Sequence, residues 1–387
     1  MMCFVNNLQE SIQDEKVRIE VSNLHVADGI CEYQVMLHAT ETEELFENQL
    51  LSILRFYQKL LTLLPKNTTP VFMRFFLSDS ANQSDILYSH LANTIHNAVS
   101  VIEQSPLDGS KIALWIYLQS GVETVALPNG LFKVCHGSYQ HYWSGSDCCP
   151  SGDSAFQTRS LLNRYIEQLT DEGCNLADNC IRTWFFVQNV DVNYAGVVKG
   201  RNEIFATQNL TPQTHFIAST GINGRSADYH SYVQLDTYGV KGIVPEQVHY
   251  LYGKTHLNPT YEYGVSFERG TSVDYGDRRH VFISGTASIN NKGEVMYPGN
   301  IKKQTERMLE NIEVLLEEAN CNFDNVQVLI IYLRDISDYT VVNSIFEERY
   351  ANIPKVIVKA PVCRPGWLIE TECIAMRLQT NSQFANL

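Results

Sequence analysis

The chain has 387 residues, of which 44% are hydrophobic and 19% are charged, and its formal net charge is −14. This length and composition indicate a compact soluble protein of two or three ordinary domains. The acidic balance argues against a nucleic acid or an anionic membrane surface as partner. It leaves room for an anionic small molecule, because a few arginines in one pocket override the overall field.

Targeting and cofactor signals are missing from the sequence. No apolar run reaches the roughly 18 residues of a transmembrane helix, and residues 1–20 lack the pattern of a secretory signal, so we predict a cytoplasmic protein. The 10 cysteines are scattered without paired zinc-site spacing, and we interpret them as reduced thiols. No HExxH or Walker A motif and no convincing GxGxxG motif occurs, so we expect no metal and no nucleotide cofactor.

The N-terminal part of the chain alternates helical and extended patterns. Apolar residues at intervals of three and four predict helices, and short apolar runs between them predict strands. The predicted elements are an irregular lead-in over 1–30 with a strand at 16–21, a helix over 43–64, a strand over 71–77, a helix over 85–103 and a strand over 111–118.

The middle part repeats a plan that is clearest at the C-terminal end. The WSGS of its opening strand corresponds to ISGT near residue 285, and a Gln-Thr pair precedes a Cys-Asn pair by the same interval in both copies. The elements predicted for the middle copy are a strand over 139–146, a helix over 155–171, a strand within 181–194 and a strand over 215–220.

The C-terminal copy has the strongest periodicity. Its opening apolar run is interrupted at Gly285, and its first helix places apolar residues on one face. The predicted elements are a strand over 281–289, a turn-rich loop over 290–299, a helix over 301–318, a strand over 326–333, a helix over 339–350 and strands over 355–362 and 367–376.

Together these repeats predict an α+β fold of tandem units, each a sheet covered on one face by two helices. We assign a divergent N-terminal unit to 1–125, a middle unit to 126–227, a tyrosine-rich insertion that lines a cleft to 228–276, and a C-terminal unit to 277–387. The uncovered sheet faces should pack together, which would give a pseudo-threefold body with clefts between units. We therefore expect a monomer.

The insertion over 228–276 is rich in tyrosine. Long loops inside compact chains are usually pocket walls or lids. A linker with structural tyrosines is the alternative interpretation.

Two carboxylates stand out near the C-terminal end. Glu370 and Glu372 lie two residues apart in an apolar run, so on a strand they share one face. Burial would raise the pKa of at least one of them, as a general acid working near neutral pH requires. Arg364 precedes them at an Arg-Pro-Gly corner, where it could hold an anion.

The repeated unit resembles the RidA (YjgF) family, through FISGTASI, the Gln-Thr helix, LIIYLRDISDY and the APVCRPG…IETECIA stretch. That resemblance implies a chorismate-mutase-like fold with sites between units. From about residue 139 the chain looks like the chorismatases, which hydrolyse the enolpyruvyl ether of chorismate and release pyruvate. The motifs that carry this narrower resemblance are STGINGR at 219–225, VSFERGTSVDYGD at 265–277, VFISGTASI at 281–289 and CRPGWLIETE at 363–372.

The resemblance implies roles for particular residues. Glu370 would protonate the methylene carbon of the enol ether, with Glu372 as the other candidate acid. Cys363 and Gly270 match small residues of the branch that forms 3-hydroxybenzoate, which is the product we expect. Chorismate or a similar dicarboxylate would need two cationic sites and a wall for the ring. The candidates for those sites are Arg364, Arg225, Arg269, Tyr263 and Tyr229.

Two other functions stay open at this point. One is an imine or enamine deaminase of the ordinary RidA type, in which Arg364 would bind a carboxylate and a glutamate would orient water. The other is a protein without catalytic activity that binds small carboxylic acids.

Overall fold

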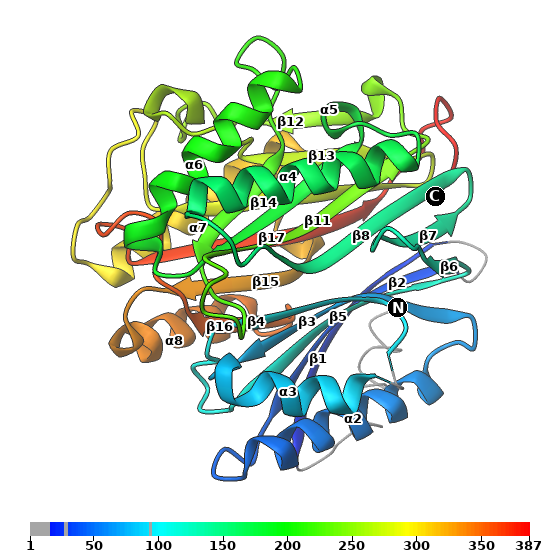
Figure 1. The fold of residues 1–387 in the computed structure, drawn as a ribbon, viewed down its shortest axis with the longest axis vertical. Coiled ribbons are helices and arrows are strands. Elements are labelled where there is room, and N and C mark those ends of the chain that lie inside the picture. Colours follow the sequence, from blue (N-terminus) through cyan, green and yellow to red (C-terminus); the bar gives the residue numbers. More distant parts are fainter. Residues whose placement is uncertain (1–15, 27–29, 93–94) are drawn as a thin grey trace.

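The computed structural model describes residues 16–26, 30–92 and 95–387. It contains three sheets, each belonging mainly to one of the predicted units, with helices on their outer faces (Figure 1). The α+β fold of tandem units is confirmed.

The N-terminal unit is a five-stranded sheet with two helices outside it. Its elements are β1 (Val17–His25), β2 (Cys31–Ala39), α2 (Phe46–Leu63), β3 (Thr68–Leu77), α3 (Ser80–Leu91), β4 (Ala98–Glu103) and β5 (Ile112–Ser120). The sheet order is β1-β2-β5-β3-β4, with β3 and β4 parallel and the other neighbours antiparallel. A separate apolar cluster fills the space between this sheet and α2 and α3.

The middle unit repeats that order with extra strands at one edge. Its elements are β6 (Glu123–Ala126), β7 (Phe132–His136), β8 (Tyr139–Cys148), α4 (Ser154–Asp171), α5 (Leu176–Asn179), β9 (Cys180–Val187), α6 (Val190–Thr207), β10 (Ala218–Asn223) and β11 (Val233–Lys241). The sheet order is β10-β9-β11-β8-β7-β6. Helices α4 and α6 lie close together, since a Cβ on Gly200 would lie 2.6 Å from the carbonyl oxygen of Ala155.

The C-terminal unit has the order β12-β13-β14-β17-β15-β16. Its strands and α-helices are β12 (Val248–Leu251), β13 (Gly270–Asp274), β14 (Arg278–Ala287), α7 (Ile301–Glu318), β15 (Val326–Leu333), α8 (Tyr339–Tyr350), β16 (Lys355–Lys359) and β17 (Ile369–Leu378). Short 3-10 helices lie at η2 (Pro245–Gln247), η3 (Thr260–Tyr263), η4 (Phe323–Asn325) and η5 (Ile336–Asp338).

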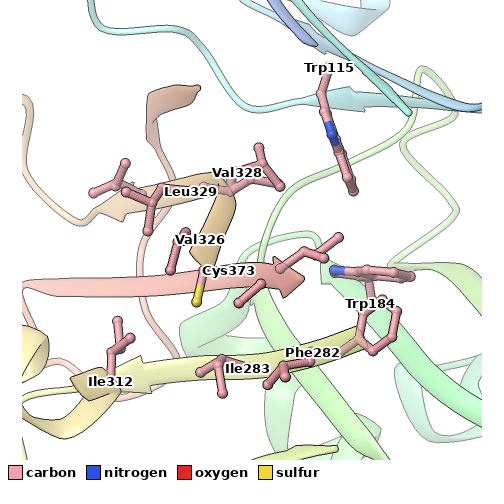
Figure 2. Packing of buried hydrophobic residues seen from close by; sticks show 14 of the residues in the cluster. Trp115, Trp184, Phe282, Ile283, Ile312, Val326, Val328, Leu329 and Cys373 are labelled. Carbon is pink, nitrogen blue, oxygen red and sulfur yellow. The ribbon is translucent and has the colours of Figure 1, made fainter. Parts of the chain in front are cut away.

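The inner faces of the three sheets share one core. Phe72 of β3 lies 5.4 Å from Trp115 of its own sheet and 5.1 Å from Trp143 of the middle sheet, between ring centroids. Figure 2 shows Trp115 pointing from the N-terminal sheet toward Trp184 of the middle sheet, with Phe282 of the C-terminal sheet nearby. The expectation that uncovered sheet faces pack together is confirmed by this shared core.

Among the buried charges of that core is a group of four that we call the central ion cluster: Arg74, Arg182, Asp236 and Glu372. Arg74 donates to Asp236 at 2.8 Å, and Arg182 donates to Glu372 at 2.6 Å. The first pair joins the N-terminal and middle sheets, and the second joins the middle and C-terminal sheets. Isolated β-bridges also join each pair of units, at Glu103–Arg225, Pro106–Val358 and Ile222–Val362.

The predicted insertion over 228–276 is not a separate segment. Its first part forms β11, which pairs with β8 and β9 at the centre of the middle sheet. Its last part forms β12 and β13 at the edge of the C-terminal sheet. The sequence prediction missed β11 because Asp236 interrupts its apolar pattern, although the strand is buried. The boundary at 125/126 also shifts, because β6 already belongs to the middle sheet.

Two local predictions were wrong or incomplete. The helix over 85–103 ends at Leu91, and its last third is β4, parallel to β3. Leu87, Leu91 and Ile95 lie four residues apart, so the helical period continues across the break. The prediction also contained no helix after β9, where α6 lies. Its glycines and its buried arginine weaken the helical pattern.

Candidate active site

A cavity of about 310 Å³ opens between the middle and C-terminal units. Helix α6 and strand β10 form one wall, and β14, β17 and the loop before β17 form the other. Aromatic side chains from both sides, Tyr194, Tyr263, Phe267 and Trp367, line it. A volume and lining of this kind suit a small ring compound.

Glu370 faces this cavity from β17. Its side chain is buried, with 4% of its surface exposed, and none of the described side chains hydrogen-bonds to its carboxyl group. Burial raises the pKa of Glu370 to about 8, and the charge of Glu372 adds to the effect, while Arg269 and Arg182 oppose it. Glu370 is therefore mostly a neutral carboxylic acid at pH 7.

The backbone of β14 provides the space for this carboxyl group. A Cβ on Gly285 would lie 2.0 Å from Oε1 of Glu370. The pairing of β14 with β17 shifts register between Ile283 and Thr286, so Gly285 lies in a bulge. The interruption at Gly285 that the sequence showed thus accommodates the acid.

Glu372 has a different environment, although it shares the strand face. Its Oε2 accepts from Arg182 at 2.6 Å and from the Thr220 hydroxyl, and its Oε1 accepts from the Trp184 indole at 2.9 Å. It is outside the set of described residues that line the cavity. The geometry therefore separates the two candidate acids, because only Glu370 is open to a ligand.

Three arginines line the cavity: Arg201, Arg269 and Arg364. The described residues place no carboxylate within ion-pair distance of any of them. Arg269 is buried and donates to the backbone oxygen of Asn258 at 2.9 Å, and its Nε has no partner within the described chain. Arg364 is half-buried and lies 4.6 Å from the centroid of the Tyr263 ring.

Arg201 is the arginine that the sequence prediction missed. It projects from α6, is 1% exposed, and its Nε and Nη2 have no hydrogen-bond partner among the described residues. A buried guanidinium without a partner is costly unless a ligand pairs with it. One signal was available, since Val197, Arg201, Ile204 and Phe205 follow helical spacing and place Arg201 on a buried face.

Cys363 and Tyr263 lie at the same cavity as predicted. Burial, helped by the charge of Glu370, raises the pKa of the Cys363 thiol to about 12. Burial also raises the pKa of the Tyr263 hydroxyl. Both groups are therefore neutral at pH 7, and Cys363 is not activated as a thiolate nucleophile.

Three predicted site residues lie elsewhere. Arg225 forms an ion pair with Glu103 of the N-terminal unit at 2.9 Å, so its charge is neutralised by a contact between units. Tyr229 is 63% exposed and lies beside His230. Gly270 packs inside the sheet, where a Cβ would lie 3.0 Å from the carbonyl oxygen of Phe282, so its small size serves strand packing.

The described residues contain no helix long and apolar enough to cross a membrane. Within the same part of the chain, no group of three or more His, Cys, Asp or Glu side chains is arranged to hold a metal ion.

Sequence comparison with known proteins finds relatives of the C-terminal unit. The family described as Endoribonuclease L-PSP matches residues 272–377. A RutC family protein of Pyrococcus abyssi is 32% identical over 99 residues, which are 25% of this chain and 78% of that protein. A 2-iminobutanoate/2-iminopropanoate deaminase of Rattus norvegicus is 28% identical over 101 residues, 26% of this chain and 74% of the enzyme. The chain belongs to the RutC family.

Over a larger part of the chain, the structure is similar to a crystal structure of a chorismatase. The TM-score is 0.63 at 18% sequence identity, and the match covers 79% of this chain and 93% of the chorismatase. This likeness establishes a shared fold that extends well beyond the C-terminal unit.

Proposed function

We propose that this protein cleaves the enolpyruvyl ether of chorismate, giving pyruvate and a hydroxylated ring acid. The observation that carries the proposal is Glu370, a buried and protonated acid facing a cavity with three arginines that lack carboxylate partners. Carbon protonation is slow, so it requires a neutral acid held in a dry site. The chorismatase-like fold supports the same assignment.

The arginines fit a substrate with two carboxylates. Arg201 and Arg269 are buried, whereas Arg364 lies on the loop before β17 and is half-buried. We assign one carboxylate to the buried pair and the other to Arg364, with the ring against Tyr263 and Trp367. Substrate binding would thereby supply carboxylates to arginines that have no carboxylate partner among the described residues.

The reaction then needs one proton donor and one nucleophile. Glu370 gives its proton to the methylene carbon, which becomes a methyl group, and the neighbouring carbon becomes an oxocarbenium ion. Water adds to that carbon and returns a proton to Glu370. The resulting hemiketal breaks its bond to the ring oxygen, which takes up the hydroxyl proton, and pyruvate leaves. If the ring hydroxyl attacks instead, it loses its proton and forms a cyclic ketal. Breaking the bond between that oxygen and the ring, with loss of the ring proton at the carbon bearing the ether oxygen, makes the ring aromatic. The remaining hemiketal then releases pyruvate, with no net uptake of water.

We propose 3-hydroxybenzoate as the aromatic product. The support is Cys363, which lies at the cavity beside Glu370, seven residues before it in the sequence. Gly270 gives no support, because it lies outside the cavity lining. Chromatography of the products against 3-hydroxybenzoate, 4-hydroxybenzoate and the dihydrodiol would distinguish the branches.

A deaminase acting on small imines is the second candidate. The similarity of the C-terminal unit to 2-iminobutanoate/2-iminopropanoate deaminase favours it. The cavity argues against it, since about 310 Å³ walled by four aromatic residues exceeds the needs of a three- or four-carbon substrate.

The test is release of pyruvate from chorismate, coupled to lactate dehydrogenase. We expect turnover by the wild type and a loss of roughly 100- to 10,000-fold in Glu370→Gln. Glu313→Gln is the matched control, because Glu313 is exposed on α7. Folded wild-type protein that releases no pyruvate from chorismate, but converts 2-iminopropionate to ammonia and pyruvate, would replace the proposal with the deaminase.

A further inference from the structure

The acid of the proposed site has a second carboxylate beside it that the proposed reaction leaves without a role. Glu372 follows Glu370 by two residues on β17, so both side chains leave the same face of the strand. Three hydrogen-bond donors contact its two oxygens, from Arg182, Thr220 and Trp184, and Nη1 of Arg74 lies 3.7 Å from Oε1. A carboxylate bonded in this way is fixed in position, and it acts as an acceptor only, as an anion does.

Thr220 links this anion to the space occupied by Glu370. Its hydroxyl donates to Glu372, and its oxygen accepts from the backbone N–H of Gly285 at 2.9 Å. The same Gly285 leaves room for Oε1 of Glu370, where a Cβ would lie 2.0 Å away. The position of β14 beside the acid is therefore tied through one hydroxyl to Glu372.

We propose that Glu372 is a positioning residue that holds Glu370 in its protonated form. It does so with a fixed negative charge beside the acid and, through Thr220 and Gly285, with a fixed space for the acid's carboxyl group. The inference rests on the proposed role of Glu370 as the proton donor. Glu372 itself does not touch the substrate.

The charges around Glu370 give the direction of the effect. Burial is the largest cause of its raised pKa, Glu372 is the next, and Arg269 and Arg182 lower it. Removing the negative charge of Glu372 leaves Arg182 uncompensated, and both changes favour the anion of Glu370. The groups that face Glu370 from the surrounding elements are Glu372, Arg182, Arg269, Arg201, Arg364, Tyr194, Tyr263 and Cys363.

The experiment is a titration that needs no substrate. The infrared spectrum of each protein is compared with that of the same protein carrying Glu370→Gln. The difference reports the protonated carboxyl group of Glu370, and it is recorded across a range of pH. In Glu372→Gln we expect the midpoint to fall by about one pH unit or more. The pH at which pyruvate release declines should fall by the same amount. A midpoint that stays near its wild-type value would overturn the inference.

Two controls separate this role from damage to the core. Asp236→Asn removes the other carboxylate of the central ion cluster, which pairs with Arg74, and we expect it to leave the Glu370 midpoint unchanged. If Glu372→Gln does not fold, Arg182→Gln combined with Glu372→Gln removes both charges of the pair. The double variant should lower the Glu370 midpoint by a smaller amount. A midpoint that does not move in the double variant would also overturn the inference.

The titration also separates this inference from the proposed function. If the wild type releases no pyruvate, the proposed function fails, but the infrared midpoint still tests whether Glu372 holds Glu370 protonated. If pyruvate is released and the midpoint does not move, only the role of Glu372 fails.

Discussion

At the scale of single residues, the site depends on groups held in unfavourable states. Glu370 is a carboxyl group that burial keeps neutral, and Arg201 is a buried guanidinium whose Nε and Nη2 have no hydrogen-bond partner among the described residues. Neither arrangement stabilises the empty protein. Both become favourable when a substrate accepts the proton or supplies a carboxylate, which is typical of functional sites.

The pH dependence of activity follows from the raised pKa of Glu370. In the proposed reaction the acid works in its protonated form, so the rate constant should be high below pH 8 and should decline as pH rises through about 8. Measuring kcat from pH 5 to 10 tests this expectation. A decline already complete by pH 6 would show that Glu370 is not a buried neutral acid.

The same group has an effect on stability with a definite sign. The folded-state pKa lies above the unfolded value of 4.5, so the folded state loses stability as pH rises from 4.5 to about 8. At about 1.4 kcal/mol per unit, this penalty reaches up to about 5 kcal/mol. Glu370→Gln should therefore be more stable than the wild type at pH 8 and nearly equal to it at pH 4.5. Urea unfolding at the two pH values measures the difference, and a Gln variant that is less stable at pH 8 would contradict it.

Arg201 should show opposite effects on binding and folding. Arg201→Met removes a buried unpaired charge, so we expect a folded protein of equal or higher thermal stability. It also removes a charge-assisted contact of about 1.5–3 kcal/mol, so KM should rise roughly 10- to 100-fold. Arg159→Met, at an ion pair with Glu203 on the surface, is the control. An unchanged KM would remove Arg201 from the site.

At the scale of elements, β14 and β17 place the acid. The bulge at Gly285 lets β17 direct Glu370 into the cavity without a steric conflict. The elements that the sequence predicted best are α7, β15 and α8, whose observed bounds match the predicted ranges. Their patterns are local, because one face of each helix is apolar and β15 is apolar except for Gln327.

The features of the site that could not be predicted from the sequence depend on contacts between units. Glu370, Cys363, Arg364, Arg269 and Tyr263 were all predicted, and all line the cavity. Arg225 belonged to a motif of the same quality, yet its ion pair with Glu103 is visible only when the N-terminal and middle units are placed together. The difference between a free and a neutralised arginine is a tertiary property, and no spacing rule reports it.

Gly285 offers a test at this scale. Gly285→Ala would place a methyl group 2.0 Å from Oε1 of Glu370, so the acid must move out of its position. We expect activity to fall on the order of 100-fold, since small misplacement of a catalytic group is costly. Gly366→Ala is the matched control, because the nearest atom to its Cβ would be 3.6 Å away. Equal activities of the two variants would argue against the role of the bulge.

At the scale of the whole molecule, three similar sheets share one core, and the proposed acid, Glu370, lies in the C-terminal sheet. In β11, Gln234 precedes Asp236 by two residues, as Glu370 precedes Glu372 in β17, so the middle unit has an amide where the C-terminal unit has an acid. Strand β5, which holds the same place in the N-terminal sheet, contains no carboxylate. We propose a monomer with a pseudo-threefold arrangement of units and one site, which light scattering would test.

Binding stoichiometry measures the number of sites directly. Titration calorimetry of Glu370→Gln with chorismate, which this variant should not consume, is expected to give one molecule bound per chain. A value near two or three would mean that the chain has further binding sites, and would contradict the proposal of a single site.

Both the middle and the C-terminal unit line the cavity, and this limits how the chain can be divided. Glu370 and its loop come from the C-terminal unit, whereas Arg201, Tyr194 and the Thr220 that contacts Gly285 come from the middle unit. A fragment ending between the units would carry Glu370 without Arg201 and Thr220, or Arg201 without Glu370, and each would expose part of the common core. Exchanging one unit with that of a single-unit relative would therefore remove part of the proposed site. The middle and C-terminal units must be kept together for the site to stay complete.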